Sequence, residues 1–355
     1  MKDIKHDLSQ SRLLVTGGAG FIGSNLAVKL LNDYPGIKIL AIDNLNDYYD
    51  TSLKDYRLSK LEGNKDFQFK KVDIADREAL NEVFTSFKPS LVFNSAAQAG
   101  VRYSIDNPDA YVESNLIGFY NILEACRHSY ENYEGGVKHL VYASSSSVYG
   151  DSNKVPYSVD DKVDNPVSLY AATKKSNELL AHAYSKLYGI PSTGLRFFTV
   201  YGPAGRPDMA YFSFTNKLLN GEKIKIFNYG NCRRDFTYID DIVLGVEKVL
   251  QSDPNLTEDG VKYDIYNIGN GEPVNLMDFV KILGEELVSA GLLKEDFDLE
   301  ANMDLIAAQP GDVVTTYADV SKLKEDFNYE PNTDFRDGIR KFVEWYKEFY
   351  LSEDK

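Results

Sequence analysis

Cysteine, long hydrophobic runs and positive charge are all scarce in this sequence, and each shortage disfavours a class of protein. The two cysteines, Cys126 and Cys232, have neither metal-binding nor redox spacing, so a reducing cytoplasm is favoured over a disulfide between them. No apolar run reaches the roughly 18 residues that a membrane-spanning helix needs. The four histidines show no ligand spacing, so no metal site is expected. The first ten residues, MKDIKHDLSQ, lack the apolar core of a signal peptide, and we expect a loose extension there.

The charge balance is acidic. The sequence has 39 Lys and Arg residues against 54 Asp and Glu residues, which gives a net charge of −15. A protein of this charge repels polyanions, so neither nucleic acid nor an anionic membrane is an expected partner. A local basic pocket for a small anionic substrate remains compatible with this balance.

The first half of the sequence alternates short apolar runs with helical patterns. The apolar runs are SRLLVTGG, IKILAID, FQFKKVDI, LVFNSAA and HLVYASS, and FIGSNLAVKLLND and REALNEVFTSF have helical spacing. This alternation predicts an α/β fold with a doubly wound parallel sheet of the Rossmann type. We expect residues 1–199 and 237–270 to form the nucleotide-binding domain. Residues 200–236 and 271–345 are expected to form a smaller, mixed α/β lobe that binds the substrate.

A glycine triplet follows the first expected strand. Gly17, Gly20 and Gly23 lie three apart, and Asp43 follows Gly23 by 20 residues at the end of the next expected strand. Glycine at these positions allows a tight turn and a close approach of pyrophosphate, and an acid at the second strand end binds the ribose diol of NAD and disfavours NADP. The sequence therefore predicts an NAD site, which we expect to include Gly17, Gly20, Phe21, Ile22, Gly23, Asp43, Asn44, Asp73, Ile74, Ala96, Asn115, Tyr170 and Lys174. Asp73 and Ile74 are expected to end the third strand beside the adenine.

Tyr170 and Lys174 are four residues apart in YAATK, so their side chains share one helical face. A tyrosine with an ordinary pKa near 10 is a poor base at neutral pH, and we expect the lysine ammonium and the oxidised nicotinamide to lower that pKa. Ser145 lies 25 residues upstream at an expected strand end, which would place its hydroxyl beside Tyr170. The three residues are predicted to catalyse hydride transfer from a substrate alcohol.

These motifs together resemble the extended short-chain dehydrogenase/reductase family of nucleotide-sugar enzymes. The stretches AAQAGVRYSIDNP, RFFTVYGPAGRPDMA, RRDFTYIDD and QPGDVVTTYAD narrow the resemblance to the UDP-glucuronate 4-epimerases. The resemblance implies a catalytic Tyr170, Lys174 and Ser145, and a position beside the active site for Asn115. It implies substrate contacts at Ser144, Ser145, Ser146, Thr199, Arg206, Arg234 and Asp312. Arg102 is added because it should lie in a loop after a strand end. Asn94 and Ser95 depart from the pattern, because many relatives have His-Leu there.

Four consecutive serines, Ser144 to Ser147, help to distinguish an epimerase from a dehydratase or a decarboxylase. Related dehydratases have an Asp-Glu pair after the hydroxyl residue, and related decarboxylases have a Glu, and these acids assist a further chemical step. Serines at these positions favour oxidation and reduction at C4 alone. The hydroxyls of Ser144 to Ser146 and Thr199, with Arg206, are expected to hold the sugar carboxylate away from the orientation in which a β-keto acid loses CO₂.

The resemblance thus implies NAD-dependent C4 epimerisation of UDP-glucuronate to UDP-galacturonate through a 4-keto intermediate. Three alternatives stay open from the sequence: a 4-epimerase of UDP-glucose or UDP-N-acetylglucosamine, a UDP-glucuronate decarboxylase, and a non-catalytic NAD-binding sensor. A homodimer formed through a helix bundle is also expected. Its motivation is the apolar spacing of Leu179, Leu180, Ala183 and Leu187 on the helix that carries Tyr170.

Overall fold

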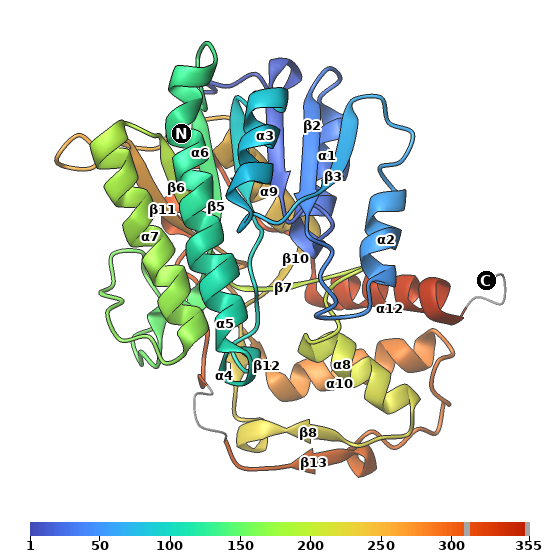
Figure 1. Cartoon of the computed structure of the whole chain (residues 1–355). Helices are drawn as coiled ribbons and strands as arrows, with labels where there is room; N and C mark the ends of the chain where they lie inside the picture. Colours follow the sequence, from blue (N-terminus) through green and yellow to red (C-terminus); the bar gives the residue numbers. More distant parts are fainter. Residues whose placement is uncertain (309–312, 352–355) are drawn as a thin grey trace.

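A parallel sheet of seven strands forms the centre of the computed structural model, which describes residues 1–308 and 313–351 (Figure 1). Its strand order is β11-β6-β5-β4-β1-β2-β3, and every neighbouring pair is parallel. The strands are β1 (Arg12–Thr16), β2 (Lys38–Asp43), β3 (Phe67–Lys71), β4 (Leu91–Asn94), β5 (His139–Ser145), β6 (Ser192–Phe197) and β11 (Tyr263–Ile268). The predicted doubly wound α/β fold is confirmed.

Helices cover both faces of this sheet because its strands are apolar on both sides. In β1, Leu13 and Val15 belong to one hydrophobic cluster while Leu14 belongs to another on the opposite face. On one face α1 packs against α9, and on the other α3 packs against α6. The helices are α1 (Phe21–Asp33), α2 (Ser52–Ser59), α3 (Arg77–Phe87), α4 (Tyr103–Asp106), α5 (Pro108–Tyr111), α6 (Phe119–Asn132), α7 (Leu169–Tyr188), α8 (Ala210–Leu219), α9 (Ile239–Leu250), α10 (Leu276–Ser289), α11 (Ser321–Phe327) and α12 (Phe335–Leu351).

Shorter elements connect these helices and build the region below the sheet in Figure 1. There α8, α10 and α12 lie beside the short strand pairs. Three two-stranded ladders pair β7 with β10, β9 with β12 and β8 with β13. The short elements are β7 (Thr199–Tyr201), β8 (Ile224–Ile226), β9 (Arg233–Arg234), β10 (Phe236–Tyr238), β12 (Val274–Asn275), β13 (Met303–Leu305), η1 (Leu8–Gln10), the π-helical η2 (Val112–Gly118), η3 (Ser146–Tyr149), η4 (Phe227–Gly230) and η5 (Glu300–Asn302). The expected residue ranges of the two lobes remain a prediction.

The local sequence explains where α7 begins and ends. The Ser168 hydroxyl accepts a hydrogen bond from the backbone N–H of Ala171, which caps the first turn. Gly189 ends the helix in the left-handed conformation, with φ 71°. The cap therefore places Tyr170 in the first turn of α7.

Two local expectations are wrong. The first ten residues are not loose, because the backbone N–H groups of Lys5 and His6 donate to the carbonyl of Gln251 at 2.7 and 2.9 Å, and Leu8 is fully buried. A single leucine in a polar stretch gave little sign of this burial. The third strand ends at Lys71, so Asp73 and Ile74 follow it in a loop.

Candidate functional site

A cavity of about 770 Å³ lies at the carboxyl ends of the parallel strands, where α/β sheets commonly bind ligands. The cavity brings together residues that are far apart in the sequence. Of the residues predicted from the sequence, it is lined by Gly17, Gly20, Phe21, Ile22, Gly23, Asp43, Asn44, Asp73, Ile74, Ala96, Arg102, Ser144, Ser145, Ser146, Tyr170, Lys174, Thr199, Arg206 and Arg234. Asp312 lies outside the described residues.

Asn115 is fully buried beside the cavity rather than in its lining. Its side chain accepts from the backbone N–H of Gln98 at 2.8 Å and donates to the Gln98 carbonyl and to the Thr173 hydroxyl. It therefore joins the loop after β4 to α7, and a direct contact with the cofactor stays a prediction.

The glycine turn between β1 and α1 has no room for side chains. A Cβ on Gly20 would lie 2.8 Å from the Gly17 carbonyl oxygen, and one on Gly23 would lie 2.5 Å from it. Gly17 itself has φ +66°, a conformation that favours glycine. No side chain caps the start of α1, so its first N–H groups are available to a phosphate. The turn thus fits the pyrophosphate of a dinucleotide.

Asp43 ends β2 at the far end of the cavity. Its carboxylate accepts a hydrogen bond from the backbone N–H of Leu45 at 2.9 Å. Nearby, the Asn44 amide donates to Asp73 at 2.9 Å, which joins the ends of β2 and β3. Lys54, which the sequence reasoning missed, places its buried ammonium 3.4 Å from Asp43. Nothing in the spacing of Lys54 from the glycine triplet marked it in advance.

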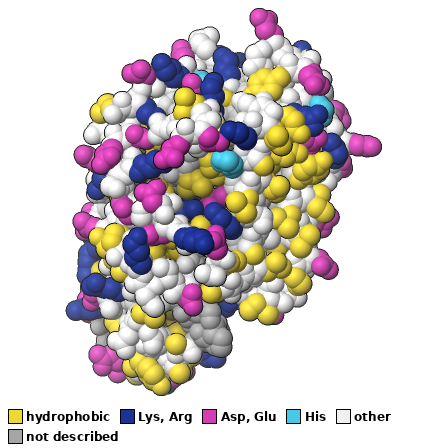
Figure 2. Space-filling model, turned by 90° about the vertical axis from the view of Figure 1, so that its left-hand side faces the viewer, with side chains coloured by type: hydrophobic (Ala, Val, Ile, Leu, Met, Phe, Trp, Pro, Cys, Tyr) yellow, Lys and Arg dark blue, Asp and Glu magenta, His cyan; other side chains and the backbone are white. Residues whose placement is uncertain are grey.

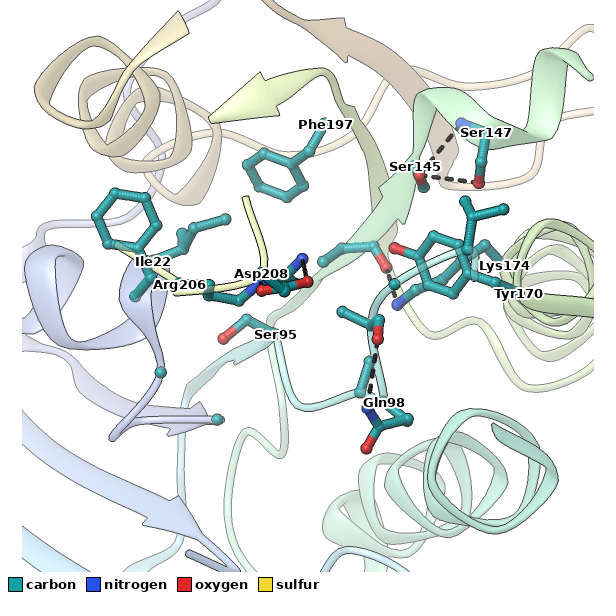
Figure 3. Close-up of a pocket in the computed structure, with 18 of the residues that line it drawn as sticks. Ile22, Ser95, Gln98, Ser145, Ser147, Tyr170, Lys174, Phe197, Arg206 and Asp208 are labelled. Atoms are coloured by element: carbon teal, nitrogen blue, oxygen red, sulfur yellow. Dashed lines mark hydrogen bonds and ion pairs between the residues drawn. The ribbon is translucent and has the colours of Figure 1, made fainter. Parts of the chain in front are cut away.

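Tyr170, Lys174 and Ser145 lie together on one side of the cavity (Figure 3). The Lys174 ammonium donates to the carbonyl of Ala143 at 2.9 Å, and burial lowers the pKa of this lysine to about 8. Burial raises the pKa of Tyr170, while the Ser145 hydroxyl and the Arg206 guanidinium oppose that rise. The net shift of the Tyr170 pKa is therefore upward, and the expected lowering by Lys174 together with the oxidised nicotinamide stays a prediction.

The four serines have different environments. The Ser144 hydroxyl donates to the buried carboxylate of Glu178 at 2.7 Å, so its proton is directed behind the strand. The Ser147 hydroxyl and backbone N–H both donate to the Ser145 oxygen, at 2.9 and 3.1 Å. Ser146 begins η3 and lines the cavity. The hydroxyl protons of Ser144 and Ser147 are thus already donated within the protein, and those of Ser145 and Ser146 remain for a ligand.

Glu178 supports the serine row from behind. It is almost completely buried, and Arg196 donates to both of its carboxylate oxygens, at 2.8 and 2.9 Å. This bidentate contact keeps the pKa of Glu178 below its usual range despite burial. Glu178 lies one helical turn after Lys174 on α7, but the sequence reasoning gave it no role.

Arg206 and Asp208 lie opposite this group, in the loop before α8. The Arg206 guanidinium donates from Nε and Nη2 to the two Asp208 oxygens, at 3.1 and 3.0 Å. The Tyr48 hydroxyl, from the loop after β2, donates to the same carboxylate at 3.4 Å. Thr199 and Arg234 line the same cavity from β7 and β9. The guanidinium of Arg206 and the hydroxyls of Tyr48 and Thr199 therefore line the same cavity as Tyr170.

The described residues contain no cluster of His, Cys, Asp and Glu that could hold a metal ion. Among the same residues, no helix has both the length and the hydrophobicity needed to cross a membrane.

Comparisons with known proteins agree with this geometry. The model of the NAD dependent epimerase/dehydratase family matches residues 13–269. UDP-glucuronate 4-epimerase 2 of Arabidopsis thaliana is 45% identical, with 97% of this chain and 77% of the relative covered. Protein CapI of Staphylococcus aureus is 47% identical, with 96% and 99% covered. The crystal structure of UDP-glucuronic acid 4-epimerase from Bacillus cereus, in complex with UDP-glucuronic acid and NAD, has a TM-score of 0.83 at 32% identity and covers 96% of this chain and all of that one.

Proposed function

The chain belongs to the NAD dependent epimerase/dehydratase family, and we propose that it interconverts UDP-glucuronate and UDP-galacturonate by epimerisation at C4. NAD is the cofactor in this proposal, and a UDP-hexuronate is the substrate. Support comes from two of the relatives named above, the UDP-glucuronate 4-epimerase 2 of Arabidopsis thaliana and the UDP-glucuronic acid 4-epimerase of Bacillus cereus.

One observation carries the choice of a hexuronate. The guanidinium of Arg206 and the Tyr170–Lys174 pair line the same cavity, so a sugar whose C4 hydroxyl meets Tyr170 has room to direct its C5 substituent toward Arg206. A carboxylate at that position would form a charge-assisted pair with the guanidinium. A neutral hydroxymethyl group would leave this cation paired only with Asp208.

The chain's own residues supply the proton transfers. Tyr170 takes the proton of the C4 hydroxyl, and its phenolate is stabilised by the hydroxyl of Ser145 and the positive charge of Lys174. NAD, when bound, supplies the hydride acceptor for C4 and returns the same hydride. The 4-keto sugar turns about its diphosphate link, so that Tyr170 gives the proton back to the oxygen of the inverted carbon. Proton and hydride both return, and each turnover leaves the enzyme unchanged.

The same site has to protect the intermediate from losing CO₂. A 4-keto hexuronate is a β-keto acid, and it decarboxylates most readily when its carboxylate stands perpendicular to the ketone. We assign Arg206, Thr199 and the Ser146 hydroxyl to hold that carboxylate, while Ser144 acts through Glu178 on the shape of the strand end. No acid stands at Ser146 or Ser147 to assist a further step.

The alternatives predict different products. A 4-epimerase of neutral sugars would favour UDP-glucose over UDP-glucuronate, and a decarboxylase would release a UDP-pentose. A non-catalytic sensor would bind NAD without turnover. The deciding experiment is incubation of the purified protein with UDP-glucuronate and separation of the nucleotide sugars. UDP-galacturonate as the main product supports the proposal, and UDP-pentose or no product excludes it.

We also propose a homodimer that works in the cytoplasm. Figure 2, which views the α7 side of the molecule, shows hydrophobic side chains gathered along one side of that face. Exposed hydrophobic residues on η2, α6 and α7 include Val112, Ile117, Tyr120, Leu179 and Leu187. An apolar surface of this kind is stabilised when a second copy covers it. Light scattering at micromolar concentration should give twice the 40.0 kDa mass of one chain, and a mass near 40.0 kDa would exclude the dimer.

A further inference from the structure

Arg57, on α2, is a buried arginine with backbone partners in place of a carboxylate. Its side chain is 2% exposed. Nε and Nη2 donate to the carbonyls of Ala204 and Gly205, at 2.9 and 3.0 Å. Nη1 donates to the carbonyl of Ala19 at 3.1 Å and to the Tyr49 hydroxyl at 2.6 Å. All four of these acceptors, three carbonyls and one hydroxyl, are uncharged.

The four acceptors belong to separate segments of the chain near the cavity. Ala19 lies in the glycine turn that fits the dinucleotide pyrophosphate, and Ala204 and Gly205 directly precede Arg206. One planar side chain therefore fixes the distance between the turn and the loop that carries Arg206. Arginine suits this task because its donors are held in a rigid plane, whereas the ammonium of a lysine is a single point.

The backbone of this loop has little freedom. Ala204 has φ +55°, a left-handed conformation that costs a residue with a side chain roughly 1 kcal/mol. A Cβ on Gly205 would lie 1.7 Å from the Tyr211 hydroxyl. Two of the three carbonyls that Arg57 binds are those of these same two residues, so its hydrogen bonds hold both peptide groups in the orientation observed. The side chain of Arg206 consequently leaves the backbone in one direction.

A second contact, at the cavity surface, joins the chain around α2 to the loop that carries Arg206. Tyr48, from the loop that precedes α2, donates to Asp208, and Asp208 binds Arg206 through two hydrogen bonds. Tyr48 before α2 and Arg57 within α2 thus contact the Arg206 loop at two places, at Asp208 and at the carbonyls of Ala204 and Gly205. Arg57 does not itself line the cavity, so any effect on a ligand has to pass through the loop.

We propose that Arg57 is the positioning residue for Arg206, and that it makes recognition of the hexuronate carboxylate depend on the geometry of the dinucleotide turn. This proposal rests on the proposed function, because it takes Arg206 as the partner of the sugar carboxylate. It goes further by assigning substrate selectivity to a buried residue of the nucleotide-binding region.

The test compares two substrates in Arg57→Lys, which keeps the positive charge but loses the planar fork. We expect kcat/KM for UDP-glucuronate to fall about tenfold and that for UDP-glucose to fall less than about threefold, since a neutral sugar makes no ion pair with Arg206. Lys60→Ala, an exposed change at the end of the same helix, is the matched control and should leave both values unchanged. Equal losses on both sugars would overturn the proposal.

A double-mutant cycle separates positioning from general damage. In an Arg206→Ala background, Arg57→Lys should not lower the ratio of the two kcat/KM values any further, because the group that it positions is absent. A further fall of the same size as in the wild-type background would show that Arg57 acts without Arg206, and it would refute the proposal.

Two further measurements distinguish a folding defect and a failure of the proposed function from a failure of this proposal. If circular dichroism shows that Arg57→Lys is unfolded, Tyr49→Phe takes its place, since it removes one of the four contacts. It should lower the ratio about twofold to threefold, and an unchanged ratio would contradict the proposal. If the wild-type enzyme does not turn over UDP-glucuronate, the proposed function fails. Calorimetric binding of the two UDP-sugars to the NAD-loaded enzyme then tests whether Arg57→Lys weakens the hexuronate selectively.

Discussion

Replacing Arg206 by alanine is expected to separate the two kinds of UDP-sugar that the cavity could hold. A charge-assisted contact between guanidinium and carboxylate contributes about 1.5–3 kcal/mol, and the 26% exposure of this side chain places Arg206 in the lower half of that range. The substitution also removes the bidentate partner of Asp208, whose carboxylate is then left near the carboxylate of the sugar. Repulsion between two charges about 4 Å apart in a water-like medium adds about 1 kcal/mol.

Together these effects amount to roughly 3 kcal/mol, or about 100-fold in kcat/KM for UDP-glucuronate. For UDP-glucose the loss should stay below about threefold, because neither charge effect applies to a neutral sugar. The less restrained 4-keto intermediate should also release more UDP-pentose per epimerisation. The assay measures initial rates on both substrates and the pentose fraction by chromatography of the nucleotide sugars.

Asp208→Asn provides the matched comparison for the repulsion. Added to Arg206→Ala, it should restore about fivefold of the lost kcat/KM for UDP-glucuronate, which corresponds to the repulsive contribution alone. Equal losses of Arg206→Ala on the two sugars, with no added pentose, would refute the reasoning. Arg206 would then hold its loop without meeting the substrate carboxylate.

Three further predictions concern the base, the cofactor and the buried histidine. Tyr170→Phe should fold and retain NAD, but its kcat should be less than a tenth of the wild-type value, which is at least about 1.4 kcal/mol of barrier; higher activity would mean that another group is the base. Protein purified without added nucleotide should release NAD(H) on extraction, and mainly NADP(H) would contradict the role of Asp43. Burial lowers the pKa of His139 from 6.5 to about 3, so the unfolded chain takes up a proton that the folded protein excludes. The free energy of unfolding should therefore fall by about 2 kcal/mol from pH 7 to pH 5 in denaturant titrations. His139→Gln should lose this dependence and the exposed-site control His128→Gln should keep it, and an equal fall in all three proteins would contradict the assignment.

Much of the fold followed from sequence because local patterns and burial agree. The alternation of apolar strands and amphipathic helices predicted a helix over residues 21–33, and α1 spans Phe21–Asp33. Residues predicted to meet do line a single cavity, because the carboxyl ends of parallel strands converge at one edge of the sheet. The family assigned from the motifs is also confirmed, since its model matches residues 13–269.

What the sequence could not predict are contacts between distant side chains. The spacing of the serines said nothing of Glu178, which accepts a hydrogen bond from the Ser144 hydroxyl. The GRPDMA stretch did not show that Asp208 already pairs with Arg206. Helical spacing likewise gave the direction of the Tyr170 and Lys174 side chains, but not the burial that raises the pKa of the tyrosine. Arg57 was missed because its four acceptors lie as far apart in the sequence as residues 19 and 205.

The strand order also determines which strand edge stays unpaired while the ribosome synthesises the protein. β11, which pairs with β6 at one edge of the sheet, is synthesised only after the whole segment that carries Arg206. Until residue 268 has left the exit tunnel, the growing polypeptide therefore presents β6 as an unpaired edge, and such edges recruit strands from other chains. A cluster of slow codons between positions 198 and 262 should prolong that exposure and lower the yield of folded enzyme. The same cluster placed far enough beyond β11 that residue 268 has already left the tunnel should be harmless.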